Sequence, residues 1–211
     1  QGNYSTVVCN RGLNRVRYRT LANNGLKSNW SDYDSNDGSK VLLNNDVIYD
    51  AGTGLTYSTI QKAVNILGGS QNLQLRRSTT ENVTISSGNF KIDMKNYTIT
   101  NSLIKNNSTL TLLNGTLNNK EHTTETIISY GTLSLSSMKI YSRDKAAVSI
   151  GSGSADIYGS STLNGINSAG LYLGGGTINL RNSSVVLSNN VNAINVGGGN
   201  LTVNDATVSA Y

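Results

Sequence analysis

The chain repeats Gly131-Thr-Leu-Ser-Leu135 as Gly153-Ser-Ala-Asp-Ile157, Gly176-Thr-Ile-Asn-Leu180 and Gly199-Asn-Leu-Thr-Val203. An earlier copy reads Ser108-Thr-Leu-Thr-Leu112. The first apolar position of each copy advances by 23, 22, 23 and 23 residues, at Leu110, Leu133, Ala155, Ile178 and Leu201. Apolar and polar residues alternate inside every copy, which predicts a short strand with one buried and one solvated face.

Two further apolar positions recur with the same period. One follows each copy by about five residues, at Leu117, Ile140, Leu163, Val185 and Val208. The other is a pair that precedes the next glycine corner, at Val148 and Ile150, Leu171 and Leu173, and Ile194 and Val196. Each repeat of about 23 residues therefore contains three short strands separated by Asn, Gly and Ser corners.

This pattern predicts an all-β fold, a right-handed parallel β-helix with three short strands per rung. Antiparallel barrels and sandwiches also use short alternating strands, but their neighbouring strands need no identical spacing over five repeats. The right hand is an expectation from the general preference of parallel crossover connections. Because one rung buries few aliphatic side chains, it is stable only when stacked on neighbours, and both ends need a cover.

The N-terminal cover is expected to be an α-helix at residues 58–67, which starts at the capping-box sequence Ser58-Thr-Ile-Gln61 and stops before Gly68-Gly69. The coil then starts with less regular inward positions, at Leu73, Leu75, Val83, Ile85, Phe90 and Ile92. At the other end, Leu201, Val203 and Val208 are expected to meet further chain or a second molecule. We assign residues 51–211 to the β-helix and residues 1–50 to a small β segment or the end of a preceding module.

Composition argues against several classes of function. The net charge of +5 is spread thinly, and after residue 51 only Arg76-Arg77 forms an adjacent basic pair, so we expect no nucleic-acid binding. One cysteine, Cys9, and one histidine suggest neither a metal site nor a cofactor. No apolar stretch approaches the roughly 20 residues that cross a bilayer, so the chain is not expected to span a membrane.

The start of the β-helix carries a family resemblance. It consists of Tyr57-Ser-Thr-Ile-Gln-Lys-Ala-Val-Asn65, a Gly-Gly pair, Leu73 and Leu75, and Glu81-Asn-Val-Thr-Ile85. This order resembles the capped start of pectin-lyase-like β-helix proteins, especially the Asn- and Thr-rich solenoids of bacterial surface proteins and phage appendages. The resemblance implies an extracellular, cell-surface or virion location. It does not choose an activity, because that superfamily includes lyases, hydrolases, adhesins and tailspikes.

Residues 1–50 do not share the repeat. Val16-Arg-Tyr-Arg-Thr20, the Asn24-Gly25 turn and Ser28-Asn-Trp-Ser31 resemble the last hairpin of a fibronectin type III-like module, over residues 16–34. Alternatively this stretch is a flap of two or three strands that packs on the solenoid and buries Trp30.

The sequence favours a non-catalytic protein. Enzymes of the family that it resembles use clustered acids, whereas no outward column of this chain holds two acids on adjacent rungs. The best enzymatic alternative lies at the corner loops, with Glu121, His122, Arg143 and Asp144. These loops are short and equally long, so we expect no wall for a deep pocket.

The outward positions are the candidate binding surface. Small polar side chains form ladders, and tyrosines offer flat apolar area that suits sugars. The candidate ligand-binding residues are Thr109, Thr111, Thr132, Ser134, Asp156, Tyr158, Tyr172, Thr177, Asn179 and Thr202.

These observations favour a non-catalytic adhesion, receptor-binding or glycan-binding segment of a bacterial surface protein or phage appendage, whose partner is a polysaccharide or cell-surface glycan. A polysaccharide lyase or glycoside hydrolase is one alternative, and a structural stalk or spacer is another.

Overall fold

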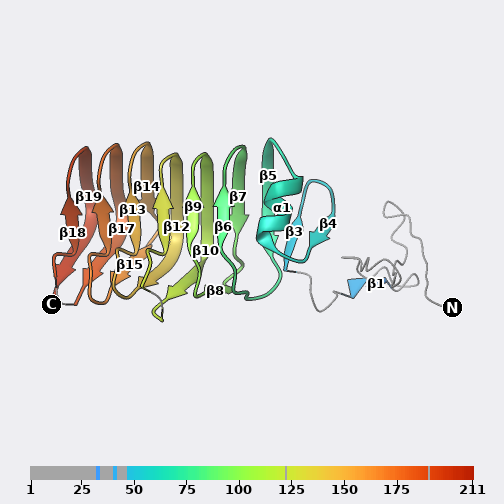
Figure 1. Cartoon of the computed structure of the whole chain (residues 1–211), viewed down its shortest axis with the longest axis horizontal. Helices are drawn as coiled ribbons and strands as arrows, with labels where there is room; N and C mark the ends of the chain where they lie inside the picture. Colours follow the sequence, from blue (N-terminus) through green and yellow to red (C-terminus); the bar gives the residue numbers. More distant parts are fainter. Residues whose placement is uncertain (1–31, 34–39, 42–46, 122, 190) are drawn as a thin grey trace.

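A computed structural model describes residues 32–33, 40–41, 47–121, 123–189 and 191–211. In these ranges the chain forms a parallel β-solenoid of about six turns, with its strands stacked along one axis (Figure 1). A wide sheet of eleven strands and a narrow sheet of six account for the solenoid. The predicted all-β parallel β-helix is confirmed.

The wide sheet supplies two of the three sides of each turn. Its parallel strands are β5 (Ser70–Leu75), β7 (Asn89–Asp93), β8 (Thr98–Thr100), β10 (Thr109–Asn119), β12 (Thr132–Ser142), β14 (Ser154–Tyr158), β15 (Thr162–Gly165), β17 (Thr177–Ser188) and β19 (Asn200–Ala210). Each of the four long strands contains one residue with positive φ, at Asn114, Ser137, Asn182 and Asp205. This left-handed conformation, which Asn and Asp tolerate better than most residues, turns the chain from the first side to the second.

The narrow sheet supplies the third side. Its strands are β6 (Val83–Ile85), β9 (Ile104–Asn106), β11 (Ile127–Ser129), β13 (Val148–Ile150), β16 (Leu171–Leu173) and β18 (Ile194–Val196). All of them pair in parallel with their neighbours, so that Ile127 lies between Ile104 and Val148.

The core consists of inward columns in which like residues lie above like. Leu110 pairs with Leu133, and the column continues through Ala155 and Ile178 to Leu201, as the sequence predicts. The predicted inward residues at the start of the coil are also buried, from Leu73 to Ile92. Stacked aliphatic side chains therefore hold successive turns together.

One predicted core position is wrong by a single residue. Val186, and not Val185, pairs with Leu163 and is buried in the second inward column. In the preceding turn, Gly159 and Ser160 both have positive φ, and the register of β17 shifts between Arg181 and Ser184. Because side chains alternate along a strand, the extra residue between Arg181 and Ser184 turns Val186 inward and Val185 outward.

Helix α1 (Ile60–Ile66) covers the N-terminal end of the solenoid, as predicted, with Ile60, Ala63 and Val64 in the core (Figure 1). The predicted capping box between Ser58 and Gln61 is wrong. Thr59 is the N-cap, and its hydroxyl accepts a hydrogen bond from the Lys62 amide at 3.0 Å.

The first turn of the coil completes this cap. Both carboxylate oxygens of Glu81 accept backbone hydrogen bonds at 3.0 Å, from Ile60 and Gln61. A full negative charge at a helix N-terminus is a stronger cap than the amide of Gln61. The Gln61 side chain instead pairs with the backbone of Thr84 in β6.

Two antiparallel strands extend the wide sheet beyond this helix. Strand β3 (Ile48–Asp50) pairs with both β4 (Leu55–Tyr57) and β5. A separate pair joins β1 (Asp32–Tyr33) and β2 (Lys40–Val41). The expected fibronectin type III-like hairpin and the expected burial of Trp30 concern residues that lie, apart from Asp32–Tyr33, outside the described ranges.

At the C-terminal end, the last turn exposes apolar side chains. Val203 and Val208 are 47% and 45% exposed, whereas their counterparts one turn earlier, Leu180 and Val186, are buried.

Replacement of one inward residue tests the stacking. We expect Leu135→Ala, in the middle of β12, to lower the free energy of unfolding by about 2–5 kcal/mol, because the cavity cannot collapse between stacked turns. Urea unfolding measures the effect. The outward Thr132→Ala in the same strand is the control and should change stability by less than about 0.5 kcal/mol. Equal losses in both variants would contradict the assignment of faces.

A corner carboxylate gives the fold a pH dependence. Partial burial alone would raise the pKa of Asp93, but hydrogen bonds from the backbone and side chain of Lys95 and from Asn114, with the Lys95 charge, lower the pKa below its usual value. Because the pKa of Asp93 is lower in the folded state, its ionised carboxylate stabilises the protein at every pH above the unfolded pKa of about 3.9. This stabilisation is lost as the pH falls through the pKa of the folded state.

We therefore expect Asp93→Asn to destabilise the protein at neutral pH, and the difference from the unmodified chain to disappear on acidification. Urea midpoints measured from pH 7 down to pH 2 test this, with the exposed Asp205→Asn as control. A difference that grows on acidification would show that the sign is wrong.

Candidate functional site

The predicted outward ladders lie on the wide sheet in the expected register. One column runs through Thr109, Thr132, Ser154, Thr177 and Asn200. The next runs through Thr111, Ser134, Asp156, Asn179 and Thr202. Nine of the ten candidate ligand-binding residues therefore share one face of the solenoid, and Tyr172 alone lies on the narrow sheet.

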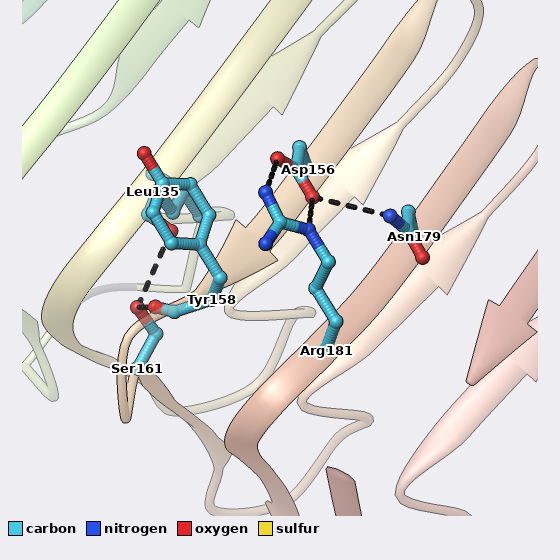
Figure 2. Close-up of polar contacts among 6 residues, drawn as sticks. All are labelled: Leu135, Asp156, Tyr158, Ser161, Asn179 and Arg181. Atoms are coloured by element: carbon cyan, nitrogen blue, oxygen red, sulfur yellow. Dashed lines mark hydrogen bonds and ion pairs between the residues drawn. The ribbon is translucent and has the colours of Figure 1, made fainter. Parts of the chain in front are cut away.

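A polar cluster interrupts these ladders at β14 and β17 (Figure 2). Arg181 donates from Nε to Asp156 Oδ1 at 2.9 Å and from Nη2 to Oδ2 at 2.6 Å. Its guanidinium carbon lies 4.6 Å from the centre of the Tyr158 ring, and Asn179 Nδ2 donates to Asp156 Oδ1 at 3.4 Å. Two neighbouring turns are thus joined by a bidentate ion pair that covers an aromatic ring.

Arg181 was not among the residues predicted from the sequence. The alternation of inward and outward residues could have predicted it, because Arg181 follows the outward residue Asn179 by two positions. Its turn also stacks on the turn that contains Asp156 and Tyr158. Hydrogen bonding to Asp156 raises the pKa of Arg181 above its usual value, and the negative charge of Asp156 acts in the same direction. Both oxygens of Asp156 and one face of Tyr158 are engaged by Arg181, so this cluster serves first to join the two turns.

A double-mutant cycle tests that role. Asp156→Ala and Arg181→Ala are made singly and together, and the free energy of unfolding in urea is measured for each variant. We expect a favourable coupling free energy between the two residues. This coupling should weaken as the NaCl concentration increases, because both side chains are partly exposed. The pair Thr132→Ala and Asp156→Ala serves as the control cycle, because these two side chains form no ion pair. Strictly additive effects of the first pair at low salt would contradict the role.

A hollow surface lies on another side of the solenoid, where the corner loops meet the narrow sheet. Its volume is about 400 Å³. The sheet contributes the outward residues Ser149, Tyr172 and Asn195, which are aligned in the register of β13, β16 and β18. The corners contribute Glu125, Lys145, Asn167, Ser168, Val191 and Asn192. Ala146 and Ala169 complete the lining, and we call this surface the groove.

Buried polar groups hold the corner loops in place. Ser142 and Ser188, both fully buried, donate to the carbonyl oxygens of Thr124 at 3.2 Å and Ser168 at 3.0 Å. Gly165 occupies the equivalent position between them, and a β-carbon there would lie 2.2 Å from the Ser168 carbonyl oxygen. The loops can therefore fold tightly over this column because its members are small or able to bond the loop backbone.

The chemistry of the groove is mixed. Tyr172, 39% exposed, presents an aromatic ring, and three asparagines present amide groups that both donate and accept hydrogen bonds. Glu125 and Lys145 add one acid and one base. Such a combination suits a ligand that has apolar faces and many hydroxyl groups.

The groove is a hollow of the surface beside the short, equal corners that the sequence predicted. The corners are short, but the surface is still hollowed, because they adjoin the outer face of the narrow sheet along three successive turns. Loop length alone does not reveal such a junction between loop and sheet.

The residues of the enzymatic alternative are only partly brought together. Arg143 Nε lies 3.8 Å from Asp144 Oδ2, and Asn167 Nδ2 donates to Asp144 Oδ1 at 2.9 Å. Glu121 is exposed, and His122 lies outside the described residues. Among the residues that the structure describes, no three His, Cys, Asp or Glu side chains gather as metal ligands would.

Comparison of the chain with known protein families, with curated proteins and with solved structures found no match. The structure supports the parallel β-helix fold that the resemblance implied. Membership of the pectin-lyase-like family stays a prediction from the sequence. Within the described ranges, no helix has the length and hydropathy of a transmembrane span.

Proposed function

We propose that this chain is a glycan-binding β-solenoid segment that acts without catalysis and that its binding site is the groove over the narrow sheet. The observation that supports the proposal best is the position of half-exposed Tyr172 among the amide side chains of Asn167, Asn192 and Asn195. A sugar ring has an apolar face that packs on an aromatic ring and peripheral hydroxyls that pair with amides.

The size of the groove agrees with this class of ligand. A volume of about 400 Å³ lies within the range of about 300–1,000 Å³ that is typical of small-ligand sites. The groove is formed by rigid strands and by short corners that buried serines hold, so a ligand would order few residues on binding.

The biological setting is part of the proposal. The Asn-, Ser- and Thr-rich composition, the solenoid fold and the resemblance at residues 57–85 favour an extracellular protein of the pectin-lyase-like kind, such as a bacterial surface adhesin or a phage appendage. In either setting a rigid rod presents a sugar-binding surface at a distance from its anchor.

A glycan array tests the function. We expect the chain to bind at least one class of polysaccharide and Tyr172→Ala to weaken that binding at least tenfold, which corresponds to about 1.4 kcal/mol. Tyr97→Ala is the matched control, because Tyr97 is 38% exposed and lies outside the groove. An array without any signal would favour a stalk or spacer, and equal losses in both variants would reject the groove as the site.

The groove also supports a test of the enzymatic alternative, because Glu125 and Lys145 both line it. A lyase or hydrolase would release unsaturated products or reducing ends from the glycans that the array identifies. Their release by the unmodified chain, and its loss in Glu125→Gln, would replace our proposal with catalysis.

A further inference from the structure

A second exposed tyrosine lies near the groove but is not part of its lining. Tyr130 follows β11 directly and is 49% exposed. Its ring occupies the space where Gly151 has no side chain, since a β-carbon on Gly151 would lie 2.4 Å from Tyr130 Cε1 and 2.8 Å from Cδ1. The ring is thus laid against the surface at the corner after β13.

Tyr172 has the same relation to the next two corners. A β-carbon on Gly174 would lie 3.1 Å from Tyr172 Cε1, and one on Gly197 would lie 3.1 Å from its hydroxyl oxygen. Gly151, Gly174 and Gly197 directly follow the paired residues Ile150, Leu173 and Val196. They form one column along the axis, which we call the glycine column, and both tyrosine rings lie along it.

The backbone does not demand glycine at these three positions. None of them is among the glycines with positive φ, in contrast to Gly153, Gly176 and Gly199 at the same corners. What a side chain would disturb is the tyrosine ring that occupies the space. The glycine column therefore keeps two aromatic rings accessible at the surface.

We propose that the sugar site extends from the groove past Tyr172 to Tyr130, so that the two rings stack two sugars of one linear oligosaccharide that are separated by one sugar unit. This inference rests on the proposed function and specifies its ligand as a chain of several linked sugars with apolar ring faces. The glycine column spans two steps between turns, roughly 10 Å, which matches about two linked sugar rings. The groove holds one end of the ligand, where the amides and the charges of Glu125 and Lys145 lie.

The experiment uses a size-graded series, from two to six sugar units, of the glycan that gives the strongest array signal. Affinities are measured by calorimetry on the full chain. We expect the affinity of the unmodified chain to increase with the length of the ligand beyond the disaccharide. We expect Tyr130→Ala to lower the affinity for the longer ligands about tenfold and to leave the affinity for the disaccharide unchanged.

A second variant guards against a loss that merely reflects misfolding. Gly151→Ala keeps Tyr130 but displaces its ring, so it should reproduce the length-dependent loss with an unchanged circular dichroism spectrum. Gly68→Ala is its control, because a β-carbon at Gly68 meets no atom within 4 Å.

The outcomes separate the two proposals. If Tyr172→Ala abolishes binding while Tyr130→Ala binds every length as the unmodified chain does, the extension is wrong and the groove stands. If Tyr172→Ala binds all lengths normally, both proposals are wrong. A length-independent loss in Tyr130→Ala would also overturn the extension.

Discussion

The structure depends on aliphatic side chains that stack in register, one turn directly above the next. A single turn buries too few of them to offset the conformational entropy of about 23 ordered residues, so each turn is stable only against its neighbours. The parallel strand ladders fix the same register, because Leu110, Leu133 and Ala155 are backbone partners as well as core contacts. The ends are then the weak places. Helix α1 and the Glu81 cap cover one of them, and the last turn leaves Val203 and Val208 exposed.

The surfaces follow from this constraint. With alternate residues committed to the core, the remaining ones form straight columns along the axis, and neighbours in a column come from adjacent turns. On the wide sheet, this geometry brings Arg181 to Asp156 and Tyr158, which were 25 and 23 residues away in sequence. On the narrow sheet, it aligns Ser149, Tyr172 and Asn195 beside three successive corners and produces the groove. It also aligns the glycine column that gives Tyr130 and Tyr172 their space.

The regular part of the fold could be predicted from sequence because periodic apolar residues report the register directly. Prediction failed where one partner lies far along the chain or where a corner changes length. Val185 was placed inward because β17 carries an extra residue at the corner between Arg181 and Ser184, which moves the inward position to Val186. The capping box failed because Glu81 supplies a charged tertiary cap. For the site, the outward ladders were located correctly. The groove was not predicted because it lies where corner loops meet a sheet, and Arg181 was not predicted because its partner Asp156 lies on the previous turn.

Cysteine pairs on the outer face test the stacking most directly, in a chain that carries Cys9→Ser. Thr109→Cys with Thr132→Cys, and Thr111→Cys with Ser134→Cys, place thiols on parallel neighbours in register, where the separation of about 4.8 Å between strands suits a disulfide. The account predicts that both pairs form disulfides under mild oxidation, and that Thr109→Cys with Ser134→Cys, displaced by two residues, does not. Cross-linking of only one in-register pair, as antiparallel strands would allow, or preferential cross-linking of the displaced pair, would contradict it.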